Sequence, residues 1–433
     1  MPQHTTRRVR QVAALAVATA VGVSLAACSS GSGGASASSS AKEPQTFSFA
    51  FSEANTSDTS ARQVADAFMK AHPGVTIQFQ KLPAESYAQA IATRIQGGNA
   101  PDAFEAESGI GQADSIQPFA KAGLLLELAN PQIKTDLAPA GIDQFSYGGK
   151  VYAVSRGSGV NGIIYNDVAA KGAGISLTGS STFNEVLNGC AAAKAKGKSL
   201  FGLAGSIPAN TSILAHEIAT STVYGPDPKW NAERNAGKVK FATTQGWTDA
   251  LNAIKTLSDK GCFQPGAGGA GFDALTNGSS SGKLFGFFAP GGAAASIEAA
   301  SGGHVKLTVL PFPAPAGVKT YASVSSDEAI AASAKTKSPK LVEEFLAYIA
   351  SPEGQKIIST GTGFPIGSKD ASQLPSTYQD VAPVVISGDT RSFPPLEWAN
   401  GKVNDDLGAG IQGILNGQKT AAQVLQQMDT DWG

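Results

Sequence analysis

The 433-residue sequence has few residues that bind metals, with three cysteines and four histidines. His216-Glu217 lacks a histidine three positions after the glutamate, so it does not make the helical zinc motif of metalloproteases. The sequence also lacks the G-x-S-x-G turn of α/β-hydrolases and the G-x-x-x-x-G-K-[ST] phosphate loop. We therefore expect no metal, no cofactor and no catalytic residue.

One nucleotide-binding pattern does occur, because Gly266, Gly268 and Gly271 fit G-x-G-x-x-G. That motif needs a strand before its loop, and here a predicted helix ending near Lys260 comes first. We therefore interpret this segment as a glycine loop.

Strong net charge and long apolar runs are missing as well. The 33 basic and 34 acidic residues give a net charge of −1, which offers nucleic acid no electrostatic attraction. No segment after residue 27 is apolar for long enough to cross a bilayer. The length favours two domain-sized units.

What is present at the start has the pattern of an export signal. Basic residues precede an uncharged apolar run, and this order predicts a signal peptide over residues 1–27. Leu25-Ala26-Ala27-Cys28 resembles the bacterial lipobox, in which the cysteine receives a lipid; an incidental Cys28 is the alternative. Residues 28–45 then form a serine- and glycine-rich tether. A two-chain lipid on Cys28 would hold the protein on the extracytoplasmic face of the cell membrane. Sec and twin-arginine export both stay open.

Two cysteines remain after the first is assigned to lipid. Cys190 and Cys262 would lie in an exported chain, where disulfides form. A disulfide is expected, with two buried free thiols as the alternative.

Secondary-structure signals alternate along the rest of the chain. Residues 46–51, 75–79 and 103–106 are predicted strands, separated by amphipathic helices over 61–72 and from Tyr87 to Gly97. The alternation resumes after residue 150. This order predicts an α/β fold with crossover helices.

The order of several segments resembles the extracellular solute-binding proteins of ABC importers, in the sugar-binding, maltose-binding-protein-like branch. These segments are AFMKAHPGVTIQF, IQGGNAPDAFEAESG, GGKVYAVSRGSGVNGIIYN, GKLFGFFAPGG and LVEEFLAYIASPEGQKIISTGTGFPIG. The resemblance implies a two-lobed periplasmic-binding-protein-like fold with three hinge crossings and a cleft between the lobes. The implied crossings lie near Ser158–Val160, Lys306–Val309 and Gly367–Asp370. The implied lobes are residues 46–157 plus 309–367 and residues 159–307 plus 371–433.

The same resemblance implies a function. A monomer would capture a mono- or oligosaccharide by hinge closure and deliver it to the permease subunits of an ABC transporter. Two alternatives stay open: a secreted glycan-active enzyme on a two-lobed scaffold, and the same binding scaffold for a non-sugar solute.

Candidate ligand-binding residues follow from sugar chemistry. Aromatic rings cover the apolar faces of a pyranose, and carboxylates, amides and guanidinium groups pair with its hydroxyls. The resemblance places a cleft aromatic at Trp398, which is the expected stacking ring, with interlobe packing as the alternative. Surface packing is expected for Trp230, with contact to the ligand as the alternative, and packing is expected for the tryptophans at 247 and 432. The expected hydroxyl-binding residues at strand ends are Glu53, Glu105, Glu107 and Ser108.

Within the third strand, Glu105 and Glu107 share a face. Arg156 is expected to bind a hydroxyl or to pair with one of these acids. Asn210 and Asp327 match positions that line the cleft in relatives, and Phe364 is expected as an apolar wall or as core. Relatives often carry an aromatic residue where this chain has Ala289-Pro290-Gly291-Gly292, and this departure leaves the identity of the sugar open.

Overall fold

The computed structural model describes residues 45–53, 60–83, 86–138, 142–301, 304–326, 328–361 and 363–433. The predicted signal peptide, Cys28 and nearly all of the tether lie outside these residues. The rest belongs to one compact unit over residues 43–433. Within the described part of the chain, every helix is too short or too polar to span a membrane.

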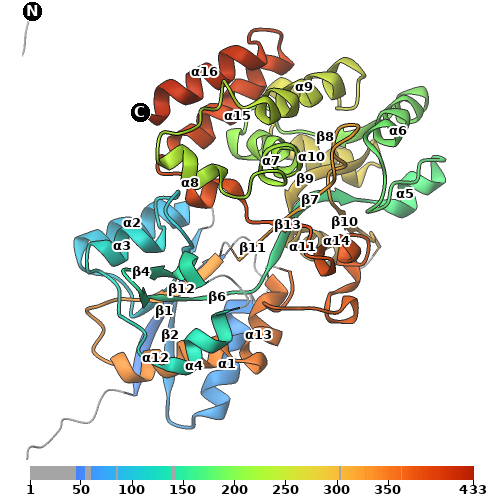
Figure 1. Cartoon of the computed structure of the whole chain (residues 1–433). Coiled ribbons are helices and arrows are strands. Elements are labelled where there is room, and N and C mark those ends of the chain that lie inside the picture. The colour runs from blue at the N-terminus through green and yellow to red at the C-terminus, as the bar shows by residue number, and fades with distance from the viewer. Residues whose placement is uncertain are drawn as a thin grey trace, which may run out of the picture. The chain divides into compact units, whose positions relative to one another are not determined.

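The first sheet has five strands in the order β2-β1-β3-β12-β6 (Figure 1). These are β1 (Thr46–Glu53), β2 (Thr76–Pro83), β3 (Ala103–Glu107), β6 (Ala153–Ser155) and β12 (Glu328–Ala332). β1, β2 and β3 are parallel, whereas β12 runs antiparallel to both β3 and β6. The predicted strand–helix–strand order of this region is confirmed.

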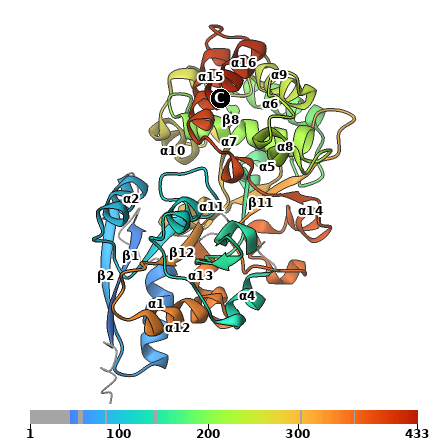
Figure 2. The same cartoon turned by 60° about the vertical axis from the view of Figure 1, so that its left-hand side comes forward.

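Side-chain alternation in β1 gives this sheet two apolar faces. Phe47, Phe49 and Phe51 are buried in one core with Phe345, whereas Ala50 faces the other core with Phe104. A strand covered on both faces needs apolar residues at successive positions, as TFSFAF provides. Helices α1 (Ser60–Ala71), α4 (Pro131–Leu137), α12 (Pro339–Ala350) and α13 (Pro352–Ile358) cover the phenylalanine face. Figure 2 shows α1 and α12 side by side there.

The opposite face is covered by α2 (Tyr87–Gly97) and α3 (Ile116–Lys121), which bury Tyr87, Ile91 and Phe119. A short hairpin of β4 (Ser146–Tyr147) and β5 (Lys150–Val151) precedes β6. We call the first sheet with these helices the first lobe.

The second sheet has the order β13-β11-β7-β9-β8, with β10 paired to β7. Its strands are β7 (Gly159–Tyr165), β8 (Ser199–Gly202), β9 (Leu284–Pro290), β10 (Thr308–Leu310), β11 (Ala322–Ser325) and β13 (Thr390–Arg391). One face packs on α5 (Asp167–Gly172), α6 (Phe183–Ala195), α7 (Pro208–Ala219), α8 (Trp230–Asn235), α9 (Gln245–Asp259), α15 (Lys402–Leu415) and α16 (Ala421–Trp432).

The other face packs on α10 (Phe272–Ser280), α11 (Gly292–Ala300) and α14 (Ala382–Ile386). Val160 and Ile164 of β7 face the helices α10, α11 and α14, whereas Ile163 and Tyr165 face the helices on the other side of the second sheet. The second sheet and its helices form the second lobe.

The chain passes between the sheets at positions that differ in part from the expected crossings. β6 and β7 are joined by residues 156–158, and β11 and β12 by residues 326–327. The crossing expected near Lys306–Val309 is wrong, because β10 still pairs antiparallel with β7 and β11 continues the same sheet. The apolar run VKLTVLPFP is compatible with either sheet, and its hydrogen bonds to β7 place it in the second sheet.

The predicted disulfide between Cys190 and Cys262 is present, with Cα atoms 4.7 Å apart. Cys190 lies on α6 and Cys262 follows α9, and both residues are fully buried. The bridge ties these two helices to the core that β8 shares with them.

Removing this bridge in a Cys190→Ala/Cys262→Ala variant should lower the free energy of unfolding by about 4 kcal/mol. A 72-residue separation gives the reduced chain much more freedom in the unfolded state. Guanidinium denaturation followed by circular dichroism measures the change, and the wild-type protein kept under reductant is the control. Equal midpoints for oxidised and variant protein would contradict the expectation.

Candidate functional site

The polar residues predicted on β3 lie where this strand ends, next to both passages between the sheets. Phe104 and Ala106 face the core under α2, so Glu105 and Glu107 share the opposite face, as a regular strand requires. β12 starts opposite this point, and Glu328 pairs in register with Glu107. Arg156 follows β6, in the passage to the second sheet.

Arg156 joins these strands in one ion cluster. Its Nη1 lies 3.0 Å from Oε1 of Glu105 and also contacts Oε2 of Glu328. Its Nη2 donates to Oγ of Ser60, at the start of α1, over 3.4 Å. The Arg156 side chain is 11% exposed and that of Glu105 is 6% exposed, whereas Glu328 is 40% exposed. The cluster is therefore buried at Glu105 and open at Glu328.

Burial removes the charged groups of Glu105 and Arg156 from water, and this changes their pKa values. Burial raises the pKa of Glu105 to about 7, although the Arg156 guanidinium and the backbone N–H of Ser52 act against this. The Ser52 N–H donates to Oε2 of Glu105 over 2.7 Å. Burial disfavours the charge of Arg156, but the two carboxylates outweigh it and raise its pKa. Of the two roles expected for Arg156, the structure shows pairing with the acids.

The loop after β3 contacts the second lobe directly, and Ser108 reaches it through Gln144. Buried Ser108 donates to Oε1 of Gln144 over 3.4 Å, and Nε2 of Gln144 donates to Oγ of Ser392 over 2.8 Å. The backbone N–H of Ile110 donates to the carbonyl of Leu396 over 2.9 Å. The second-lobe segment is held in turn by α8, where Asn231 donates to the carbonyl of Pro394.

This approach of two backbones requires glycine. A Cβ on Gly109 would lie 2.2 Å from the carbonyl oxygen of Leu396, and one on Gly111 would lie 2.3 Å from that of Pro395. A Cβ on Gly401 would lie 2.0 Å from the carbonyl oxygen of Gly111. We call these three glycines with Pro395 and Leu396 the glycine contact.

Trp398 does not offer a stacking face. It is fully buried, its Nε1 donates to Oδ1 of Asn231 over 3.0 Å, and its ring meets His216 edge-on at 5.1 Å. Its ring also packs against Phe241 and Trp432, so the stacking role expected for it is corrected to packing within the core of the second lobe. The other three tryptophans pack in or against this same core.

Asn210 and Phe364 are also buried, and they lie outside the ion cluster. The Asn210 side chain accepts from the N–H of Ala204 and donates to the carbonyl of Phe288, which ties α7 to β9. Phe364 packs on Tyr378 with ring centroids 5.3 Å apart. Both polar groups of the Asn210 side chain therefore bond within the fold, and Phe364 packs in the core.

Two of the predicted ligand-binding side chains have no described position. Asp327 and the side chain of Glu53 lie outside the described residues. Three residues that the sequence did not single out belong to the site: Glu328, Gln144 and Asp114, an aspartate in the loop after β3. Glu328 and Asp327 are adjacent acids in SSDEAI, and only strand pairing distinguishes them.

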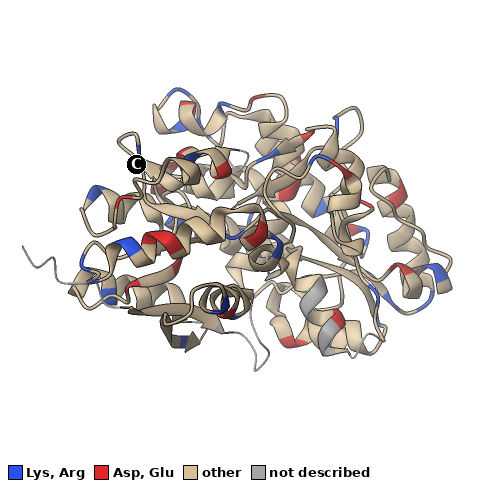
Figure 3. Ribbon diagram, turned by 90° about the horizontal axis from the view of Figure 1, so that it is seen from below, with Lys and Arg blue, Asp and Glu red and all other residues tan. Residues whose placement is uncertain are grey.

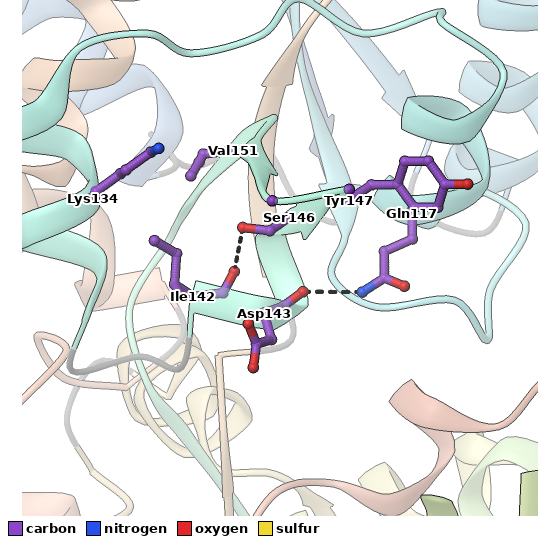
Figure 4. A pocket seen from close by; sticks show the side chains of 9 residues that line it. Gln117, Lys134, Ile142, Asp143, Ser146, Tyr147 and Val151 are labelled. Carbon is purple, nitrogen blue, oxygen red and sulfur yellow. Dashed lines mark hydrogen bonds between the residues drawn. The ribbon is translucent and has the colours of Figure 1, made fainter.

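A separate hollow of about 370 Å³ lies in the first lobe, beside the β4–β5 hairpin (Figure 4). Two of its polar side chains bond to the backbone: Gln117 donates to the carbonyl of Asp143, and Ser146 donates to that of Ile142. None of the predicted ligand-binding residues lines it. As to metals, no group of three or more histidine, cysteine or acidic residues suited to an ion occurs among the described residues.

A Glu105→Gln variant should change how stability depends on pH. Between the ordinary pKa of 4.5 and about 7, folded Glu105 holds a proton that the unfolded chain has lost. The unfolded state therefore binds fewer protons there, and this group lowers the free energy of unfolding as pH rises. The stability of the wild type relative to Glu105→Gln should fall through this window and then level off.

Urea denaturation of both proteins at a series of pH values measures the difference. Glu344→Gln, which removes an exposed carboxyl group from α12, is the matched control. A wild-type advantage that grows with pH across the window would disprove the role given to Glu105.

A Gly111→Ala variant should weaken the glycine contact. The added methyl group overlaps a carbonyl oxygen, at a cost of about 1–3 kcal/mol, which separation of the two segments relieves. Small-angle scattering of the ligand-free variant should give a larger radius of gyration than the wild type. Gly172→Ala, where a Cβ meets nothing within 4 Å, is the control. Equal radii for the Gly111 and Gly172 variants would refute the expectation.

Comparison with known proteins agrees with this fold. Residues 63–383 match the family described as bacterial extracellular solute-binding protein. A search of curated protein sequences finds no significant match. Among solved structures, a protein from work on xylan utilization by Caldanaerobius polysaccharolyticus has a TM-score of 0.74 at 21% identity, covering 89% of this chain and 99% of its own.

Two other solved structures are similar. A chitin oligosaccharide binding protein has a TM-score of 0.69 at 19% identity, covering 90% of this chain and 98% of its own. A Bacillus licheniformis sugar transporter protein in complex with stachyose has a TM-score of 0.66 at 19% identity, covering 89% and 98%. At these identities the similarity establishes the two-lobed α/β fold. Because the family match covers more than half of the sequence, the chain belongs to the bacterial extracellular solute-binding protein family.

Proposed function

We propose that this protein captures a mono- or oligosaccharide between its lobes and delivers it to the permease of an ABC importer. The observation that carries the proposal is the ion cluster of Glu105, Arg156 and Glu328, which lies at the edge of the first sheet beside two passages to the second. Binding proteins of this kind hold their ligand at such an edge.

The chemistry of the cluster suits a polyhydroxylated ligand. Carboxylates accept hydrogen bonds from hydroxyl groups, and the half-exposed Glu328 leaves acceptor oxygens open to solvent. The similar solved structures described as binding chitin oligosaccharide or stachyose support a sugar. Because Trp398 is buried, we attribute recognition to hydrogen bonding by the first lobe rather than to that ring.

We assign the lobes by the two passages described above and by the third crossing expected near Gly367–Asp370. The first lobe then comprises residues 46–157 and 328–367, and the second 159–326 and 371–433. Ligand that contacts both lobes favours the closed arrangement only through contacts that the open form lacks. Lipid on Cys28 would keep the protein, acting as a monomer, at the membrane that holds the permease.

A thermal-shift screen over sugars, amino acids, polyamines and metal chelates tests the proposal. A bound ligand stabilises the folded state, so the cognate sugar should raise Tm, and titration calorimetry should give a Kd near micromolar, or about −8 kcal/mol. Stabilisation by non-sugars alone would overturn the choice of a sugar.

An enzyme on the same scaffold would give a different result. A binding protein returns its ligand unchanged, so chromatography after prolonged incubation with the bound oligosaccharide should recover it intact. Cleavage that is lost in the Glu105→Gln or Glu107→Gln variant would favour a glycan-active enzyme instead.

A further inference from the structure

The ion cluster contains more acidic than basic groups. Glu105, Glu107 and Glu328 gather around Arg156, which ion-pairs with the first and third and interacts electrostatically with the second. Basic and acidic residues are interspersed along much of the ribbon in Figure 3. Around Arg156, three carboxyl groups surround one guanidinium group, which gives this site a local excess of acidic groups.

Asp114 adds a fourth carboxyl group, and its environment is unusual. It lies in the loop after β3, where the backbone of its neighbour Ser115 forms an isolated β-bridge with that of Glu107. Its residue is 3% exposed, and its Oδ1 has no hydrogen-bond partner among the described residues. Burial raises its pKa to about 6 and the charge of Glu328 adds to this effect, although the backbone N–H of Asp114 itself interacts with the carboxyl group and acts against it.

A buried carboxylate oxygen without a donor is costly. The acids of the cluster interact electrostatically with one another, since Asp114 acts on Glu105 and on the Tyr87 hydroxyl, and Glu328 acts on Asp114. A ligand that brings a positive charge and several N–H donors would satisfy Oδ1 and offset the excess of negative charge at once. An ammonium group has three such donors.

We propose that this site selects a cationic sugar, one whose protonated amine is held by the carboxyl groups of Asp114 and its neighbours Glu107 and Glu328. The inference rests on the proposed function and narrows its ligand to amino sugars. A neutral sugar offers hydroxyl donors but leaves the negative charge uncompensated. Affinity for the cationic sugar should therefore depend on ionic strength, because salt screens attraction between partly exposed charges.

Three trisaccharides with the same β-1,4 backbone make the test. They carry an amine (glucosamine trimer), an acetamide (N-acetylglucosamine trimer) or a hydroxyl group (cellotriose) at C2. Titration calorimetry of the wild type at about pH 6.5 should give at least tenfold tighter binding for the amine than for either neutral sugar. That advantage should shrink at least threefold when sodium chloride is raised from 20 to 500 mM, on the order expected for screened ion pairs.

Asp114→Asn keeps the shape and removes the charge, so it should cut the preference for the amine at least tenfold. Asp273→Asn, which removes an exposed carboxyl group at the start of α10, is the matched control and should keep the wild-type preference. Should the Asp114 variant fail to fold, as judged by circular dichroism, the salt dependence of the wild type still decides.

The experiments can overturn the cationic ligand without overturning the sugar-binding function. Binding of a neutral trimer as tightly as the amine, or a preference for the amine that salt leaves unchanged, overturns the cationic ligand and leaves the sugar-binding function standing. Absence of binding by all three trimers, with stabilisation by non-sugars in the thermal screen, overturns the proposed function and the cationic sugar with it.

Discussion

The contact between Arg156 and its two glutamates organises this part of the molecule. Arg156 lies in a passage between the sheets, and its partners lie on β3 and at the start of β12. Removing such charges from water costs free energy that the ion pairs only partly return, so their main effect is to specify geometry. One guanidinium thereby fixes the relative positions of α1, β3, β12 and the passage that follows β6.

The loop after β3 extends this organisation to the second lobe. Ser108 and Gln144 fix its start, and the glycine contact brings its backbone against the segment that α8 holds. Backbone hydrogen bonds across this contact need no side chain, which lets two loops approach closely. A ligand shifts the balance between open and closed lobes only through contacts that one of the two arrangements lacks.

Local patterns were sufficient to predict most elements of this fold. The alternation of phenylalanines in β1 and the amphipathic spacing of α1 and α2 report burial directly, so these elements were predicted close to their observed bounds. The second crossing was misplaced for a physical reason. An apolar strand such as β10 packs equally well in either sheet, and only its hydrogen bonds to β7 assign it.

The sequence by itself determined the α/β class and the chemical character of Glu105, Glu107 and Arg156, because these depend on local periodicity and on side-chain chemistry, and it left the pairing of Cys190 with Cys262 to the Cα separation in the fold. Only the tertiary structure decided that Trp398 and Asn210 are interior residues, and that Glu328 and Asp114 join the acids of β3. A residue's type states which contacts it can make, whereas its partners come from distant segments, as Glu328 lies 172 positions from Arg156. Long-range packing sets those partners, and no local pattern records it.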